Sequence, residues 1–127
     1  MPKTTKAHFE LFKKECLYWQ ERLGLQRWEL IVAHEELGSL LSQLRYNCSS
    51  YRATAVLNIT WDGVDKSERL NNNTIITSAI HEIVHLLKAE MSSLGRERYV
   101  GEDELFRAEE AVVNILVREF MKLRKGN

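Results

Sequence analysis

The segment between Asn72 and Gly95 constrains the fold of this chain most strongly, because it is long, apolar and periodic at helical spacing. Residue types that favour helix starts occupy 72–74, and Gly95 is the predicted stop. At about 100° per residue, four apolar side chains form one stripe: Ile76, Ile80, Ile83 and Leu87. His81 and His85 fall on roughly the opposite side. We therefore expect the two histidines to face away from the helix's core contact, towards a cleft.

Residues 81–85 read His-Glu-Ile-Val-His. Because positions i and i+4 lie on one helical face, His81 and His85 can present both imidazoles to one metal ion. Glu82 is placed to reach a metal-bound water instead of the metal. This H-E-x-x-H arrangement supplies two zinc ligands and a general base. The competing interpretation is a pair of solvated histidines beside a structural helix.

Composition sets the outer limits on fold and partners. A length of 127 residues fits one domain, 1–127. Eighteen basic residues balance eighteen acidic ones, so there is no global basic field for nucleic acid. Cys16 and Cys48 form neither a disulfide framework nor a C-x-x-C pair, so cysteine ligation of zinc is not expected. Without an apolar leader or a run of membrane-spanning length, we expect a cytoplasmic protein with no membrane partner.

The rest of the chain predicts an α+β order of elements. A first helix is capped by Thr4 or Thr5 and ended by Gly24. Its buried face is formed by Phe9, Phe12, Cys16, Trp19 and Leu23. A last helix starts after Gly101.

Strands are expected in the middle of the chain. Arg27–His34 is a strand candidate, whereas 35–41 is either a loop or a short helix. Residues 42–48 and 51–61 both alternate between two faces, which predicts a hairpin with a half-buried second strand. Residues 64–73 are polar and predict a loop that leads into the motif helix.

The motif leaves one ligand to be found, since a catalytic zinc usually takes three from the protein. No histidine follows His85, so a later ligand must be a carboxylate, and the last helix offers Glu109 and Glu110. Helical periodicity places Glu109 near the centre of the buried stripe and Glu110 on its margin beside Asn114. A buried carboxylate needs a partner, which a metal would provide. His34, on the early strand, is a weaker alternative.

The pair of segments His81–His85 and Glu110–Asn114 resembles the gluzincin family, of which thermolysin is the familiar member. In that family a second helix carries the ligand glutamate, commonly followed by alanine, with Asp or Asn four positions after the glutamate. Glu110-Ala111-Val112-Val113-Asn114 matches that form. The resemblance implies Glu110 as the third ligand, in preference to Glu109, and Asn114 as a residue that orients a histidine.

The order of elements is most similar to the minimal zincin-like domains of phage and prophage proteins and of the ImmA/IrrE and SprT-like groups. The SprT-like pattern uses a later histidine, which this chain lacks. The resemblance implies a minimal zincin-like fold. Such a fold has an N-terminal helix, a small antiparallel-containing sheet of two to four strands, the H-E-x-x-H helix and a C-terminal ligand helix.

The expected function is that of a zinc metallopeptidase, in which Glu82 activates a metal-bound water to hydrolyse a peptide bond. By resemblance, a peptide or protein substrate would lie along an edge strand beside the motif helix, and the 51–61 strand is the candidate. The oxyanion donor stays open among Tyr46, Tyr51, Arg98 and Tyr99. The alternative is a catalytically inactive zincin-fold binding or regulatory module with structural zinc. A metal hydrolase acting on RNA is disfavoured by the neutral charge.

Overall fold

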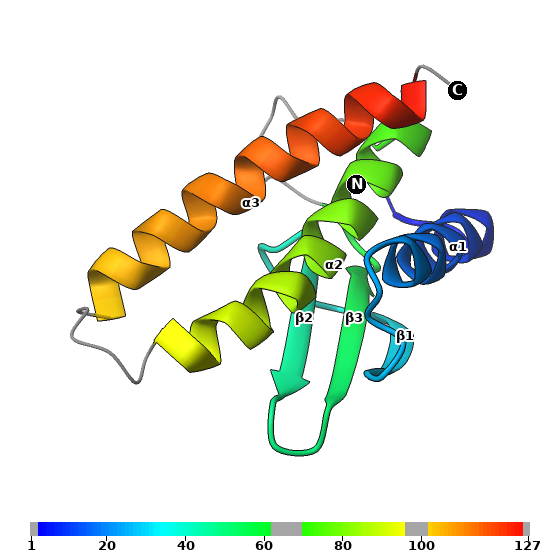
Figure 1. The fold of residues 1–127 in the computed structure, drawn as a ribbon. Coiled ribbons are helices and arrows are strands. Elements are labelled where there is room, and N and C mark those ends of the chain that lie inside the picture. The colour runs from blue at the N-terminus through cyan, green and yellow to red at the C-terminus, as the bar shows by residue number, and fades with distance from the viewer. Residues whose placement is uncertain (1–2, 62–69, 96–101, 126–127) are drawn as a thin grey trace.

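A computed structural model describes residues 3–61, 70–95 and 102–125, apart from the side chains of 90–95, 102–109, 111–112 and 125. The predicted loop at 64–73 therefore lies largely outside the described residues. Three helices and three strands follow one another along the chain (Figure 1): α1 (Lys6–Arg22), β1 (Glu29–Glu35), β2 (Ser42–Asn47), β3 (Arg52–Asn58), α2 (Asn72–Gly95) and α3 (Glu102–Lys125). The predicted α+β class is confirmed.

The sheet is mixed, with strand order β1-β3-β2. β2 and β3 pair antiparallel, which confirms the predicted hairpin, and β1 pairs with β3 in parallel. The prediction that the 51–61 strand forms the edge beside the motif helix is wrong. β3 is the central strand because β1 returns to its second edge, so the outer strand that contacts α2 is β2.

α2 is the central helix of the molecule. It crosses β2 and β3, with α1 on one side and α3 on the other (Figure 1). The predicted stripe is only part of its core contact. Ile80 and Ile83 are fully buried, but Ile75 and Leu86 are buried as well, and Ile76 and Leu87 are buried only in part. The helix is surrounded by neighbours, so the single apolar stripe predicted from the sequence is too narrow.

The helix starts are set by side-chain caps. Asn71 Oδ1 accepts from the Thr74 backbone N–H at 2.9 Å, and Thr74 Oγ1 accepts from the Asn71 N–H at 3.0 Å. This reciprocal pair makes Asn71 the cap of α2, one residue before the predicted capping positions 72–74. Thr5 caps α1 in the same reciprocal manner with His8. Gly24, with φ of +70°, follows the end of α1, as the sequence predicts.

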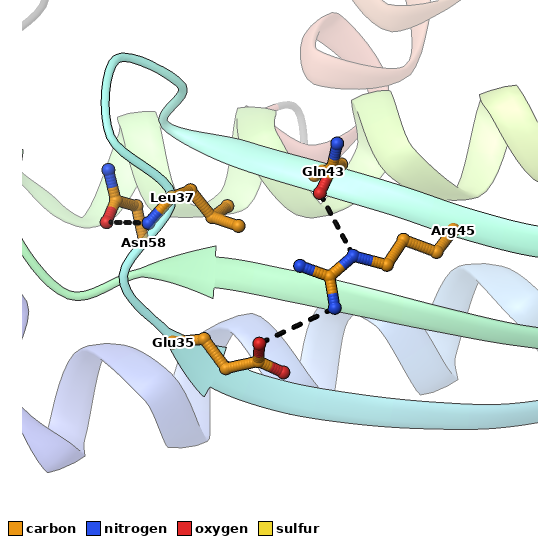
Figure 2. Close-up of polar contacts among 5 residues, drawn as sticks. All are labelled: Glu35, Leu37, Gln43, Arg45 and Asn58. Atoms are coloured by element: carbon orange, nitrogen blue, oxygen red, sulfur yellow. Dashed lines mark hydrogen bonds and ion pairs between the residues drawn. The ribbon is translucent and has the colours of Figure 1, made fainter.

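The segment 36–41 is a loop, and Asn58 at the end of β3 holds it (Figure 2). The Asn58 side chain is fully buried and its Nδ2 donates to the carbonyls of Gly38 (3.1 Å) and Leu40 (2.6 Å). Its Oδ1 accepts from the Leu37 N–H at 2.9 Å. The central strand thus fixes the loop that leads into β2.

A buried ion pair ties α1 to the last turn of α3. Glu15 is 1% exposed and accepts two hydrogen bonds from Arg124, at 3.0 and 2.7 Å. Trp19 stacks on Phe120 one turn away, with ring centroids 4.9 Å apart. Cys16, between them on α1, is a buried free thiol, as predicted, and burial raises its pKa.

In the part of the chain that the structure describes, no helix has both the length and the apolar character needed to cross a membrane.

Candidate metal centre

His81 and His85 come together on the face of α2 that looks towards β2 and α3. Their Nε2 atoms are 3.0 Å apart, and their ring planes meet edge to face with centroids 4.6 Å apart. Both side chains are half-buried. Burial lowers the pKa of His81, which favours the neutral imidazole that binds metals.

Glu110 reaches the same point from α3. Its Oε1 lies 3.4 Å from His85 Nε2. One donor atom from each of His81, His85 and Glu110 lies within 4.8 Å of the other two. Two helices that are distant in sequence therefore converge on one cluster of two nitrogens and one carboxylate oxygen.

The donor set fits zinc in type and spacing. Ligand distances of 2.0–2.2 Å in tetrahedral geometry place neighbouring donors about 3.4 Å apart. The distance of 3.4 Å from His85 Nε2 to Glu110 Oε1 equals that value, the two histidine nitrogens are somewhat closer at 3.0 Å, and all three pairs lie within 4.8 Å. Two histidines with one glutamate are also a known catalytic zinc set.

Two further residues of α3, Glu109 and Asn114, were considered from the sequence. The Glu109 side chain lies outside the described residues, so Glu109 as the third ligand stays an open alternative. Asn114 is exposed on α3 and makes no hydrogen bond to either histidine in the described part of the chain. Its implied role in orienting a histidine finds no support in this geometry.

Glu82 lies beside the cluster and points into a buried position. It is 4% exposed, and one of its carboxylate oxygens, Oε2, accepts a hydrogen bond from the Ser42 hydroxyl at the start of β2. Burial raises the pKa of Glu82 to about 7, and the negative charge of Glu110 adds to the rise, while the Ser42 hydrogen bond opposes it. A carboxyl with this pKa can exchange a proton near neutral pH.

The other residues that the sequence offered for the site are His34 as a ligand and four candidate oxyanion donors. His34 lies away from the cluster: its Nε2 is 2.6 Å from Thr4 Oγ1, and its ring stacks on Phe9. The alternative of His34 as third ligand is therefore wrong, because the strand carries it to α1. Tyr51 receives a hydrogen bond from Arg27, whereas Tyr46 lines the cleft of the metal cluster. Arg98 and Tyr99 lie outside the described residues.

The cluster opens into a cleft of about 470 Å³ between β2 and the two helices. Its walls are formed by Leu40, Ser42, Gln43, Leu44, Tyr46, His81, Glu82, His85 and Glu110. The outer strand β2 thus forms one wall and the proposed ligands form the other. Ser42 could not be identified from the sequence, because no local pattern marks a serine at the start of a strand as a partner of Glu82.

Glu110 also has a cationic neighbour. Lys88 Nζ lies 3.7 Å from Glu110 Oε1, and the Lys88 side chain is 13% exposed. The Glu110 carboxylate therefore forms an ion pair with Lys88, and a bound metal would share this carboxylate with the Lys88 ammonium group.

No protein-family model, curated protein or solved structure matches the chain.

Proposed function

We propose that this protein is a zinc metallopeptidase. The observation that carries the proposal is the convergence of His81, His85 and Glu110 at a cleft that also holds the buried carboxyl of Glu82. A metal held only for structure has no need of a further carboxyl beside it that is not a ligand. A general base in a metal-assisted hydrolase must lie there.

Each residue has a distinct task in the proposed reaction. His81, His85 and Glu110 hold the metal. Zinc, when bound, supplies an acidified water and polarises a carbonyl. Glu82 takes the proton from the attacking water and passes it to the leaving amine. Ser42 fixes the orientation of the Glu82 carboxyl by donating a hydrogen bond to it.

The substrate class follows from the shape of the site. β2 is an outer strand of the sheet and lines the cleft, so an extended peptide can add to the edge of β2 that no described strand pairs with. Main-chain hydrogen bonds to β2 would bring a peptide carbonyl beside the cluster. We therefore propose β2, and not the 51–61 strand expected from the sequence, as the strand with which the peptide pairs.

A second candidate is an inactive zincin-fold binding or regulatory module. The observation that favours it is the Lys88–Glu110 ion pair, which gives the carboxylate a partner without a metal. In such a module Glu82 would have no chemical task, so hydrolysis separates the two candidates.

The test is hydrolysis of a mixed peptide library by the zinc-reconstituted chain, followed by mass spectrometry. We expect cleavage that stops on addition of a zinc chelator and returns with added zinc. A chain that holds zinc but cleaves no peptide or unfolded protein would contradict the enzyme and leave the binding module.

The choice between the two carboxylates is tested by zinc titration of matched variants. Glu110→Gln is expected to weaken zinc affinity by at least about 100-fold. Loss of a residue that only hydrogen-bonds to a metal ligand already lowers metal affinity by about 10- to 100-fold, and loss of a ligand itself should cost more. Glu109→Gln, one residue earlier on the same helix, is the control and should leave zinc affinity unchanged. The reverse pattern would make Glu109 the ligand.

A further inference from the structure

A second cavity, of about 420 Å³, adjoins the metal centre along the first half of α2. It reaches His81 and Glu82 at one end. Thr74 and Ser78 line it from the row of α2 that continues to Glu82, since these residues are spaced four apart. If a ligand at the metal cluster directs a side chain along α2 towards Thr74, that side chain enters a cavity bordered by Glu82, the proposed base.

The cavity wall is rich in hydroxyl groups and poor in charge. Besides Leu41, the lining before the metal centre consists of Ser42, Thr74, Thr77 and Ser78. No lysine or arginine is among the described residues that line it. An acidic side chain would therefore find no lysine or arginine among the described lining residues, and a wholly apolar one would leave polar groups without water or partners.

Three of these hydroxyls have already donated their protons. Ser42 donates to Glu82, Thr74 donates to the Asn71 carbonyl at 2.9 Å, and Thr77 donates to a carbonyl one turn earlier at 2.8 Å. A hydroxyl has one donor and two acceptor positions. Ser42 and Thr77 therefore offer acceptor oxygens to a ligand.

Ser78 differs from the other three. It is 7% exposed, lines the cavity, and its hydroxyl makes no hydrogen bond to any described residue. The Ser78 oxygen is not among the buried side-chain atoms that lack a partner, so it is accessible from the cavity. Its proton is available to a ligand that brings an acceptor.

On the basis of the proposed function, we propose that this cavity binds the side chain of a substrate residue next to the scissile bond, and that this side chain is a carboxamide, glutamine or asparagine. The carboxamide oxygen accepts from Ser78, and the two amide hydrogens donate to the acceptor oxygens of Ser42 and Thr77. A basic side chain would pair with Glu82 and occupy the proposed base.

The test compares glutamine with methionine, which has nearly the same shape and no amide. Two peptides that differ only at the residue flanking the cut are assayed for kcat/KM. Two peptide hydroxamates with the same difference are titrated calorimetrically against the zinc-loaded chain. We expect the glutamine member of each pair to be favoured by at least about 2-fold, since one hydrogen bond contributes about 2- to 12-fold.

Ser78→Ala should reduce the difference between the glutamine and methionine values in both assays, while Ser50→Ala, an exposed serine on the β2–β3 turn, should leave the difference unchanged. Equal or better binding of methionine, or a preference for lysine, would overturn the carboxamide assignment and leave the peptidase intact. A zinc-loaded chain that neither cleaves peptides nor binds the hydroxamates would instead refute the proposed function, and this inference with it.

Discussion

The Glu82→Gln variant is expected to keep its fold and its zinc and to lose hydrolysis by about 10²- to 10⁴-fold, the range for loss of a general base. Glutamine is nearly isosteric and can still accept the hydrogen bond from Ser42, but it cannot take up a proton. Burial raises the pKa of Glu82 to about 7 because a buried charge is costly. The glutamine side chain is neutral and avoids this cost, so the variant should remain folded. The measurement is kcat at matched zinc occupancy, with circular dichroism as the check on folding.

Glu119→Gln is the matched control, because Glu119 is an exposed carboxylate on α3 paired with Lys122. It should retain full turnover. Loss of zinc in Glu82→Gln would make Glu82 a ligand instead of the base. Unchanged turnover would remove Glu82 from the reaction.

The Arg124→Ala variant is expected to lower the free energy of unfolding by about 2–3 kcal/mol, below the range of about 3–5 kcal/mol for a fully buried ion pair, because the Arg124 side chain is 30% exposed. Glu15 is 1% exposed and would be left as a buried carboxylate without its two hydrogen bonds from Arg124. The guanidinium also lies over the Tyr18 ring, 4.6 Å from its centroid. Urea denaturation followed by circular dichroism measures the change.

Lys122→Ala provides the comparison, since the Lys122–Glu119 pair is exposed on both sides. Exposed pairs contribute about 0–1 kcal/mol. The double variant Glu15→Leu with Arg124→Ala should recover part of the loss, because no charge is then left buried. Should Arg124→Ala prove no more damaging than Lys122→Ala, the ion pair would not be what holds α1 to α3.

The helices and the hairpin could be predicted from local patterns, but the neighbours of each strand could not. Alternation in 51–61 assigns residues to two faces and says nothing about which strand lies on either side. The return of β1 to pair with β3 depends on long-range packing. Alternation puts Val56 and Asn58 on the face opposite Ala55 and Leu57, which a half-buried strand would expose, yet all four are fully buried. There, Asn58 holds the 36–41 loop, and Arg45 on β2 reaches Glu35 on β1 across β3 (Figure 2).

Some residues of the candidate site could likewise be predicted from the sequence, whereas others could not. His81, Glu82 and His85 follow from spacing within one helix, and Glu110 follows from a family resemblance. Ser42 and Ser78 carry no signal in the sequence, because serine hydroxyls are common on strands and helices and their partners depend on tertiary packing. Glu15 and Arg124 are separated by 109 positions, so no local pattern relates them.

The most direct test of the metal centre is the zinc content of the purified chain after reconstitution and removal of free metal, measured by elemental analysis. We expect one zinc per native chain and none in His81→Ala or His85→Ala, because each variant removes one of the nitrogens that lie 3.0 Å apart. A native chain that stays free of metal in the presence of saturating zinc would contradict the account.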